Sequence, residues 1–402
     1  MNRSFNAVPV AKDVFWVGAI DWSIRDFHGY ATQNGTTYNA YLVMADKVTL
    51  VDTVKARFKD ELLARVASVV DPARIDYIVS NHSEMDHSGC LQAVADAVRP
   101  EKVFASAMGV KNLNANLHPS VEIAPVADGS TLSLGNKTLT FMETKMLHWP
   151  DSMFSYLADE QLLFSQDAFG MHLASMERFD HQLPEPLLQA EAAKYYANIL
   201  NHLSPKVQAL LQKVKAMNLP LKLVATDHGP VWSEKIPWIV GLYERWAAQL
   251  PTDRAIVVFD TMWESTAAMA QAIAEGVNAA GARVKLMRMG PDHRSDVVTE
   301  LLDAGALLAG SPTLNNNIFP TMADVLTYAR GLRPLNKLCA AFGSYGWSGE
   351  SVKQIEQFFT DMKLEKAAES VSVKYVPDAD ALKSCYDLGL AVGGKLKKVA
   401  SA

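Results

Sequence analysis

Short apolar segments alternate regularly with longer amphipathic segments in the C-terminal part of the chain. The short segments predict strands over 254–259, 283–288, 305–310, 337–342 and 371–376. The longer segments repeat their apolar residues at helical spacing and predict helices over 266–280, 295–303, 320–331, 350–362 and 378–397. This regular alternation is typical of a doubly wound parallel sheet with helices on both faces. We therefore predict a C-terminal α/β domain over residues 254–402.

Strands and helices alternate less regularly in the N-terminal part. Extended segments are predicted within 14–54 and over 75–81, 102–107, 131–144, 161–166 and 221–229. Helices are predicted over 56–70, 91–99, 186–203 and 205–217. This order suggests stacked layers with sheets inside and helices outside. The pattern changes within QLPTDRAIVVFD, residues 249–260, where PTD indicates the end of a linker before the strand predicted over 254–259, so we predict an N-terminal domain over residues 1–250.

Composition narrows the class of protein but does not identify a function. Hydrophobic residues make up 49% of the 402 residues and charged residues 20%, which is ordinary for a globular protein. A net charge of −6 gives no electrostatic reason to expect nucleic acid as a partner. No apolar run approaches the length of a membrane span. The three cysteines form no CxxC motif and no export signal is visible, so we expect a reducing, cytoplasmic location.

The stretch NHSEMDHSG, residues 81–89, places four candidate metal ligands directly after a predicted strand. These ligands are His82, Glu84, Asp86 and His87. A turn that leaves a strand can direct such side chains toward one point, and loops at strand ends commonly carry binding sites. The alternative is a solvated polar turn in which a side chain such as Asp86 caps the next helix.

Three further residues, His148, Asp167 and His228, each follow a strand-like segment. Taken singly, a histidine in a loop is more often an ordinary surface residue than a ligand. As a series on separate strand ends, the three residues support a metal site shared with the first cluster. Imidazole suits zinc, iron and copper, and carboxylate favours harder ions. Ligand type alone leaves both iron and zinc open.

Three loops of the C-terminal domain follow predicted strands: DTMWEST (260–266), SPTLNNN (311–317) and GSYGWSGE (343–350). All three are expected at the carboxyl ends of parallel strands, where a doubly wound sheet binds its ligands. The first loop has no GK[ST] sequence, which argues against a nucleoside triphosphate. The chain also has no GxGxxG sequence, which argues against a bound dinucleotide.

The side chains of these loops suit a mononucleotide with a flat ring. Thr261, Ser265 and Thr266 offer hydroxyls at a helix start, where anions such as a monophosphate bind. Trp263 and Trp347 can stack on the ring, as can Tyr345 in the third loop. The alternative is an ordinary capped helix with tryptophans in the core. Three loops at matching strand ends favour flavin mononucleotide, FMN.

The ligand order HxExDH…H…D…H resembles the flavodiiron branch of the metallo-β-lactamase-fold proteins, and the three loops resemble those of flavodoxin. The resemblance implies a metallo-β-lactamase-like αββα sandwich followed by a flavodoxin-like doubly wound parallel sheet. It also implies a non-haem diiron centre. The implied ligands are His82, Glu84 and His148 for one iron, Asp86, His87 and His228 for the other, and Asp167 as the bridge. Zinc hydrolases of this fold usually carry a histidine where this chain has Glu84.

The resemblance further implies where FMN and the outer groups of the metal centre lie. His28 and Tyr195 would lie near the irons as catalytic groups that orient ligands or relay protons. The FMN-binding residues would be Thr261, Met262, Trp263, Glu264, Ser265, Thr266, Ser311, Pro312, Thr313, Leu314, Asn315, Asn316, Ser344, Tyr345, Gly346, Trp347, Ser348 and Gly349.

Flavodiiron proteins reduce dioxygen to water, nitric oxide to nitrous oxide, or both. The resemblance therefore implies an oxidoreductase that takes electrons from rubredoxin and passes them through FMN to two irons. It also implies a head-to-tail homodimer, or a dimer of such dimers, in which the flavin of one subunit serves the irons of the next. One alternative is a zinc hydrolase of the lactamase fold fused to a flavodoxin domain. Another is an electron carrier with an inactive metal domain.

Overall fold

The computed structural model describes residues 5–400, which form two compact units. The first unit contains residues 5–28, 32–195 and 205–244. The second contains Gly29–Ala31, Tyr196–Ser204 and residues 245–400. Two short segments from the N-terminal half of the chain therefore pack with the C-terminal residues. The domain ranges 1–250 and 254–402 stay a prediction, because packing units and domains defined from sequence need not coincide.

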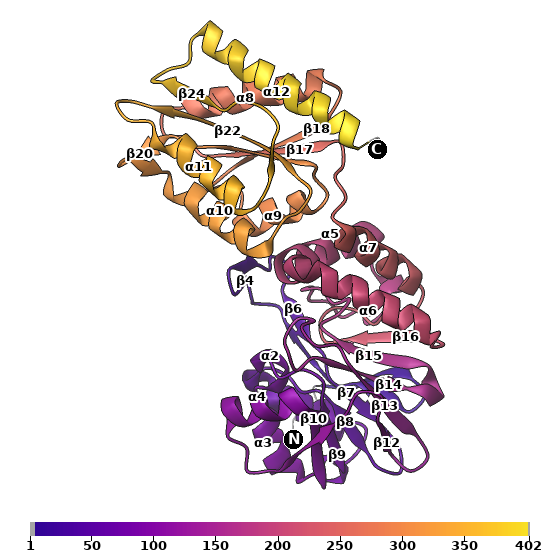
Figure 1. The fold of residues 1–402 in the computed structure, drawn as a ribbon. Coiled ribbons are helices and arrows are strands. Elements are labelled where there is room, and N and C mark those ends of the chain that lie inside the picture. The colour runs from indigo at the N-terminus through magenta and orange to yellow at the C-terminus, as the bar shows by residue number, and fades with distance from the viewer. Residues whose placement is uncertain (1–4, 401–402) are drawn as a thin grey trace. The chain divides into compact units, whose positions relative to one another are not determined.

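Two β-sheets lie at the centre of the first unit (Figure 1). The larger has the strand order β1 (Val8–Ala11), β2 (Val14–Trp16), β7 (Tyr41–Val43), β8 (Thr49–Val51), β9 (Tyr77–Ser80), β10 (Lys102–Ser106) and β11 (Ile123–Val126). The smaller has the order β12 (Thr131–Ser133), β13 (Thr138–Glu143), β14 (Met153–Leu157), β15 (Leu162–Gln166) and β16 (Leu223–Thr226). Val79 of β9 and Phe164 of β15 belong to one buried core. The two sheets therefore pack face to face.

Helices cover the outer faces of these sheets. Successive strand residues point to opposite faces, so Ile78 lies in a second core together with Leu62, Leu91 and Leu113. Those leucines come from α1 (Lys59–Ala67), α3 (Leu91–Val98) and α4 (Ala107–Leu117). Figure 1 shows α5 (Glu185–Tyr195), α6 (Ser204–Met217) and α7 (Ile236–Ala248) near β15 and β16. The layers are therefore helix, sheet, sheet, helix, as the αββα prediction states.

Shorter elements complete the N-terminal half. The short strands are β3 (Ala19–Asp21), β4 (Asp26–Phe27), β5 (Tyr30–Ala31) and β6 (Thr36–Tyr38). The short helices are η1 (Ala56–Phe58), η2 (Pro72–Arg74), α2 (Met85–Ser88), η3 (Ala158–Glu160) and η4 (Asp180–Gln182). Antiparallel pairing of β3 with β6 places the chain around Thr36 next to Asp21.

One continuous helix is predicted over 186–203, but the structure interrupts the α-helix there. The prediction of a continuous helix is therefore wrong. The α-helix α5 ends at Tyr195, a π-helix η5 covers Tyr196–Leu200, and a 3₁₀-helix η6 covers Asn201–Leu203. Within the second unit, the Asn198 side chain donates to the Ser295 carbonyl at 3.2 Å and accepts from the Tyr328 hydroxyl at 2.9 Å. Helical periodicity carries no information about these long-range bonds. Such π segments are frequent at functional sites.

The second unit is a parallel sheet covered by helices. Its strand order is β18 (Arg283–Arg288), β17 (Arg254–Phe259), β19 (Ala306–Gly310) and β22 (Leu338–Tyr345), and both β23 (Glu365–Lys366) and β24 (Val371–Lys374) pair with β22. The helices are α8 (Ser265–Ala279), α9 (Arg294–Leu302), α10 (Pro320–Leu332), α11 (Glu350–Asp361) and α12 (Ala379–Val399). A two-stranded sheet joins β20 (Thr313–Leu314) and β21 (Asn317–Ile318). The predicted doubly wound parallel sheet is confirmed.

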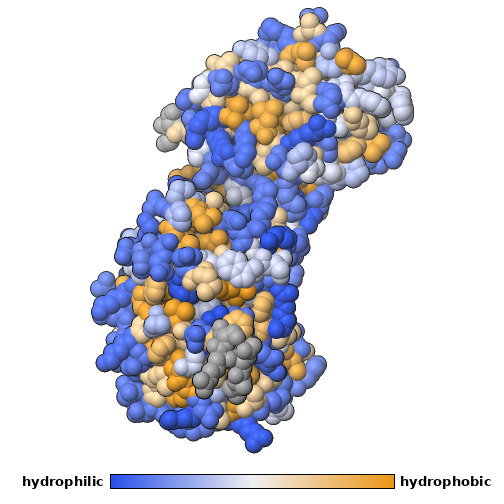
Figure 2. All heavy atoms as spheres, turned by 180° about the vertical axis from the view of Figure 1, so that it is seen from behind, coloured by the Kyte–Doolittle hydropathy of each residue, from blue (hydrophilic) through white to orange (hydrophobic). Residues whose placement is uncertain are grey.

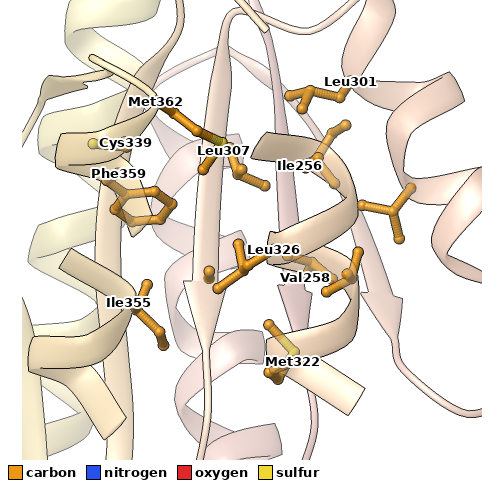
Figure 3. Close-up of a cluster of buried hydrophobic side chains, with 14 of the residues drawn as sticks. Ile256, Val258, Leu301, Leu307, Met322, Leu326, Cys339, Ile355, Phe359 and Met362 are labelled. Carbon is orange, nitrogen blue, oxygen red and sulfur yellow. The ribbon is translucent and has the colours of Figure 1, made fainter. Parts of the chain in front are cut away.

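Both faces of this sheet are buried, which explains the continuous apolar runs of its strands. Ile256 and Val258 pack with Met322 and Leu326 of α10 and with residues of α11 (Figure 3). Val257 points to the opposite face, where α8 and α12 cover it. A parallel sheet covered in this way brings the carboxyl ends of its strands to one edge, where their loops are free to bind a ligand.

The surface of the molecule is mixed in character. On the face shown in Figure 2, hydrophilic residues are interspersed with smaller hydrophobic areas. Scattered apolar residues of this kind are normal on folded proteins. Within residues 5–400, no helix has the length and apolar character needed to cross a bilayer.

Candidate functional site

The first cluster of predicted ligands lies where β9 ends and α2 begins. His82 and Glu84 precede the helix, while Asp86 and His87 lie in its first turn. All four residues are buried, so the alternative of a solvated polar turn is wrong. Asp86 does not cap α2, since the N-cap position is Glu84 and no side chain donates or accepts a capping hydrogen bond there.

The structure brings the three later residues to the same place. His148 comes from the segment between β13 and β14, Asp167 follows β15 and His228 follows β16. Candidate ligand atoms converge in two groups, His82, Glu84, His148 and Asp167 in one, and Asp86, His87 and His228 in the other. In each group these atoms lie within 4.8 Å of one another. All seven predicted metal-site residues therefore take part in one pocket.

Asp167 lies between the two groups. Its Oδ2 is 3.0 Å from Nε2 of His148 and 3.3 Å from Nε2 of His82. Its Oδ1 is 3.2 Å from Nε2 of His87 and 3.4 Å from Nε2 of His228. One carboxylate oxygen therefore faces each group, which is the arrangement that a bridging ligand requires.

The remaining carboxylates each serve one group. Glu84 Oε2 lies 3.2 Å from Nε2 of His148 and 3.4 Å from Nε2 of His82. Asp86 Oδ2 lies 3.2 Å from Nε2 of His228. Each group thus combines two imidazole nitrogens with carboxylate oxygens, a mixed donor set that suits iron or zinc.

The electrostatics of the pocket favour positive charge. Burial alone would lower the pKa of His82, but hydrogen bonds to Asp151 and Glu84 and the charge of Asp167 raise that pKa well above its usual value. Burial would raise the pKa of Asp167, but the neighbouring histidines lower it well below its usual value. The histidines therefore stabilise the ionised form of Asp167, and the carboxylates in turn stabilise positive charge on His82.

Several buried polar atoms of the pocket have no hydrogen-bond partner. They are Nε2 of His82, Nε2 of His87, both carboxylate oxygens of Asp86, and Oδ1 of Asp167. Buried polar atoms in proteins are almost always paired, so a converging set of unpaired nitrogens and oxygens needs an explanation. Two metal ions held here would give these atoms partners, and the residues present therefore fit a dinuclear metal centre.

A second site is a cavity of about 440 Å³ in the second unit, within the range typical of small-molecule pockets. Twelve of the predicted FMN-binding residues line it: Met262, Trp263, Ser265, Pro312, Thr313, Asn315, Asn316, Ser344, Tyr345, Gly346, Trp347 and Ser348. They come from all three predicted loops. The cavity therefore opens at the carboxyl ends of β17, β19 and β22, as a doubly wound sheet predicts.

The six other predicted residues lie in the same loops without lining the cavity: Thr261, Glu264, Thr266, Ser311, Leu314 and Gly349. Two of them make side-chain hydrogen bonds there, and a third has an unpaired hydroxyl. Thr266 bonds the Ser344 hydroxyl at 2.9 Å, and the Ser311 hydroxyl donates to the Pro312 carbonyl at 2.8 Å. Thr261 is buried and its hydroxyl has no hydrogen-bond partner, which fits a phosphate acceptor beside the start of α8.

The aromatic residues of the cavity are not core residues. Trp263 is 89% exposed and Trp347 is 87% exposed, so the alternative that places these tryptophans in the core is wrong. Exposed indoles beside a cavity are available to stack on a flat ring. The sequence analysis missed two lining residues, Tyr375 and Val376, which follow β24 in a loop that has no binding motif.

Known proteins match this chain along nearly all of its length. The family described as ODP family beta lactamase matches residues 36–229, and the flavodoxin family matches residues 257–389. Rubredoxin-oxygen oxidoreductase of Megalodesulfovibrio gigas is 45% identical over 375 residues, which cover 92% of this chain and 93% of that protein. Nitric oxide reductase of Moorella thermoacetica is 42% identical over 393 residues, which cover 97% of this chain and 98% of that protein.

Two solved structures share the fold of this chain along nearly its whole length. Rubredoxin oxygen:oxidoreductase from Desulfovibrio gigas superposes with a TM-score of 0.97 at 43% identity, covering 99% of this chain and 100% of that chain. The flavodiiron protein of Giardia intestinalis superposes with a TM-score of 0.96 at 29% identity, covering 100% of this chain and 99% of that chain. This chain belongs to the flavodiiron protein family. The predicted resemblance and the two-part fold are thereby confirmed.

Two outer residues were predicted for the metal centre of this flavodiiron protein. Nε2 of His28 lies 3.5 Å from Glu84 Oε1, and the His28 side chain is 76% exposed. The ring of Tyr195 is buried, with its centroid 6.0 Å from that of His228, and burial raises its pKa well above the usual value. The structure therefore places both residues beside the ligands, one facing solvent and one enclosed.

Two more residues of the metal centre were not predicted. His172 is buried with its ring centroid 4.7 Å from that of His228, and its Nδ1 lies 2.8 Å from the Thr36 hydroxyl. Asp151 is buried with Oδ2 3.3 Å from Nδ1 of His82. Neither residue belongs to the ligand motif, so the pattern of ligands along the chain gave no signal for them.

Proposed function

We propose that this flavodiiron protein is an oxidoreductase that reduces dioxygen to water, nitric oxide to nitrous oxide, or both. The observation that carries the proposal is the pocket in which Asp167 faces two groups of histidines and carboxylates. The names of two close relatives, rubredoxin-oxygen oxidoreductase and nitric oxide reductase, support the same pair of substrates. When bound, two irons supply the gas-binding centre and two electrons, and FMN supplies two more electrons.

Seven residues would hold the irons. The proposed ligands are His82, Glu84 and His148 for one iron, Asp86, His87 and His228 for the other, and Asp167 for both. Three carboxylates in one buried pocket offset most of the charge of two divalent ions, which lowers the electrostatic cost of burying the pair. Glu84 favours an iron centre over the alternative of a zinc hydrolase, since a carboxylate is a harder ligand than imidazole.

Two further residues would manage protons. His28 reaches from solvent to Glu84, so its imidazole can carry protons between the surface and the pocket. Tyr195 is buried with its ring beside that of His228, and burial keeps its hydroxyl protonated, so the hydroxyl would serve as a hydrogen-bond donor there. Both reactions consume protons at the gas-binding centre, and these side chains provide one exposed and one enclosed donor.

The C-terminal unit would hold FMN by its phosphate and by its ring. Thr261 and Ser265 would bind the phosphate with the first N–H groups of α8. Trp263 and Trp347, which are exposed beside the cavity, would stack on the ring. We assign residues 1–250 to the metal domain and residues 254–402 to the FMN domain. The open mouth leaves the ring edge accessible for electron exchange.

Rubredoxin is the proposed donor, as the name of the relative from Megalodesulfovibrio gigas indicates. The proposed assembly is a head-to-tail homodimer, or a dimer of such dimers, in which the flavin of one subunit reduces the irons of its neighbour. Exposed Trp263 and Trp347 beside the cavity offer an apolar surface for such partners. The three cysteines are free and buried, which supports a reducing, cytoplasmic location.

Metal analysis followed by anaerobic turnover tests the proposed function. The purified protein should contain iron and FMN, and the pre-reduced protein should consume dioxygen and nitric oxide when rubredoxin supplies electrons. Comparing turnover with each gas identifies the preferred substrate. A protein that contains zinc, hydrolyses ester or amide substrates and consumes neither gas would contradict the proposal. A protein that exchanges electrons but consumes neither gas would be an electron carrier instead.

A further inference from the structure

The histidine ligands of this flavodiiron protein differ in what their outward-facing nitrogens contact. Nδ1 of His82 lies 3.3 Å from Oδ2 of Asp151. Nδ1 of His228 lies 2.6 Å from the carbonyl oxygen of Thr37. A backbone carbonyl is neutral, whereas a carboxylate carries charge and is the stronger acceptor. Histidines of the two ligand groups therefore differ in the acceptor that lies beside Nδ1.

The ligand His87 provides a second contrast. Its Nδ1 lies 3.5 Å from the Asp227 carboxylate and makes no hydrogen bond. His82 therefore has a closer carboxylate than His87, although both imidazoles are fully buried. The hydrogen bond to His82 distinguishes Asp151 from Asp227, which lies beside His87 without forming one.

Asp151 is itself held firmly in place. Its Oδ2 accepts a hydrogen bond from the Ser83 N–H at 2.7 Å, and its Oδ1 accepts one from the Asn112 side chain at 3.2 Å. Its carbonyl accepts one from the Ser106 hydroxyl at 2.6 Å. Asp151 is 2% exposed, so water does not compete for these bonds. The carboxylate therefore cannot turn away from His82 without breaking other buried bonds.

Helix α4 anchors this arrangement. Asn112 lies on α4, and the Ser106 hydroxyl caps its first turn by accepting from the Gly109 N–H at 3.0 Å. The Asn112 side chain also donates to the Ser83 hydroxyl at 3.1 Å, next to His82 in the chain. A rigid helix on the outer face of the larger sheet thus fixes the carboxylate that contacts a metal ligand.

We propose that Asp151 is a positioning residue for the metal ion held by His82. Its carboxylate accepts a hydrogen bond from Nδ1–H of His82, which selects the tautomer whose unprotonated Nε2 faces Glu84 and Asp167 and makes that nitrogen a stronger metal ligand. His87 and His228 lack this support, so the two metal positions differ in affinity and electronic environment. The inference rests on the diiron function proposed above and concerns one of its two positions.

The replacement Asp151→Asn tests the inference, because it keeps the size of the side chain and removes its charge. Protein loaded with two ⁵⁷Fe ions should lose iron to a chelator from one position about 10–100-fold faster than the wild type. Its Mössbauer spectrum should show one changed doublet and one unchanged doublet. FMN content should stay the same, since the flavin cavity is in the other unit. The matched control is Asp60→Asn, at an exposed carboxylate.

The outcomes separate the inference from the proposed function. If the wild type does not bind paired iron, the proposed function itself fails. If the wild type binds paired iron and Asp151→Asn leaves both doublets and both chelation rates unchanged, the inference about Asp151 is overturned. Should Asp151→Asn fail to fold, Asn112→Ala provides the test, because it loosens the carboxylate and keeps its charge. A smaller change in one doublet supports the inference, and two unchanged doublets overturn it.

Discussion

The metal pocket and the flavin cavity of this protein are built in opposite ways. The proposed metal ligands lie at strand ends and most of them are buried, and contacts such as that of Asp151 with His82 hold them in place. The flavin cavity is open, and its two tryptophans are almost fully exposed. The difference teaches that one site is shaped to enclose charge and exclude water. The other is shaped to hold a large ring while leaving its edge accessible to an electron donor.

Removal of iron should produce the largest difference in effect between the metal site and the flavin cavity. Chelation should abolish consumption of both gases, because the gas-binding centre is lost. Ligand binding at about 1,000 times its dissociation constant stabilises a folded unit by about 4 kcal/mol. The unfolding temperature of the first unit should therefore fall by about 10 °C, while that of the second unit stays unchanged. Scanning calorimetry with and without iron measures both transitions, and an equal shift of both would contradict independent sites.

Replacing the bridging carboxylate should have the next largest effect. Asp167→Ala leaves the histidines of both groups without the acceptor that lies between them. Loss of a residue beside a ligand costs about 10–100-fold in metal affinity, so loss of the bridge should exceed 100-fold. Gas consumption by pre-reduced protein and iron content should both fall, whereas FMN content should not. Asp60→Asn is the surface control, and full activity in Asp167→Ala would remove Asp167 from the ligand set.

The phosphate contact can be tested by Thr261→Val. The Thr261 hydroxyl is buried without a hydrogen-bond partner beside the start of α8, and a hydrogen bond to a charged group contributes about 1.5–3 kcal/mol. FMN affinity should therefore fall by about 10–100-fold, with iron content unchanged. Fluorescence titration of the apoprotein with FMN measures this. Thr360→Val, at an exposed threonine of α11, should bind FMN normally. Unaltered FMN affinity in Thr261→Val would rule out the phosphate contact.

The smallest of these effects is expected for Trp347→Ala. An aromatic pair contributes about 0.5–1.5 kcal/mol beyond its area burial, so FMN affinity should fall by about tenfold or less. The fold should be unaffected, because the side chain is 87% exposed. Reduction of the flavin by rubredoxin should slow more than reduction by dithionite, which needs no docking surface. Trp22→Ala, at an exposed tryptophan of the first unit, is the control. Equal slowing with both reductants would argue against a role in docking.

The two units also differ in how well their sequence predicts their structure. In the C-terminal unit, strands such as 254–259 and helices such as 320–331 were predicted to within a few residues. Apolar runs there alternate with helical periods, so the local pattern along the chain indicates these elements. In the N-terminal part, helix α4 (Ala107–Leu117) was not predicted and the helix after residue 186 was predicted without its break. Asn198, which lies within that break, bonds the Ser295 carbonyl, a contact far away along the chain that local periodicity does not indicate.

The same limit applies to the sites. The seven candidate ligands could be identified because their types and order along the chain form a pattern. Asp151, His172 and Tyr375 could not, since each reaches its site through tertiary packing. No spacing along the sequence identifies a carboxylate that hydrogen-bonds a ligand residue from outside the metal site. Residues that bind a cofactor directly are thus easier to predict than the residues that hold them in place.

The most direct test of the central claim is the amount of dioxygen consumed by fully reduced protein in a single turnover. Reduction of dioxygen to two waters takes four electrons, which two ferrous irons and one FMN hydroquinone supply together. We predict consumption of about one dioxygen per chain that holds two irons and one FMN, with no release of hydrogen peroxide. Consumption of dioxygen with an equal amount of hydrogen peroxide released, or none consumed despite full loading, would contradict the account.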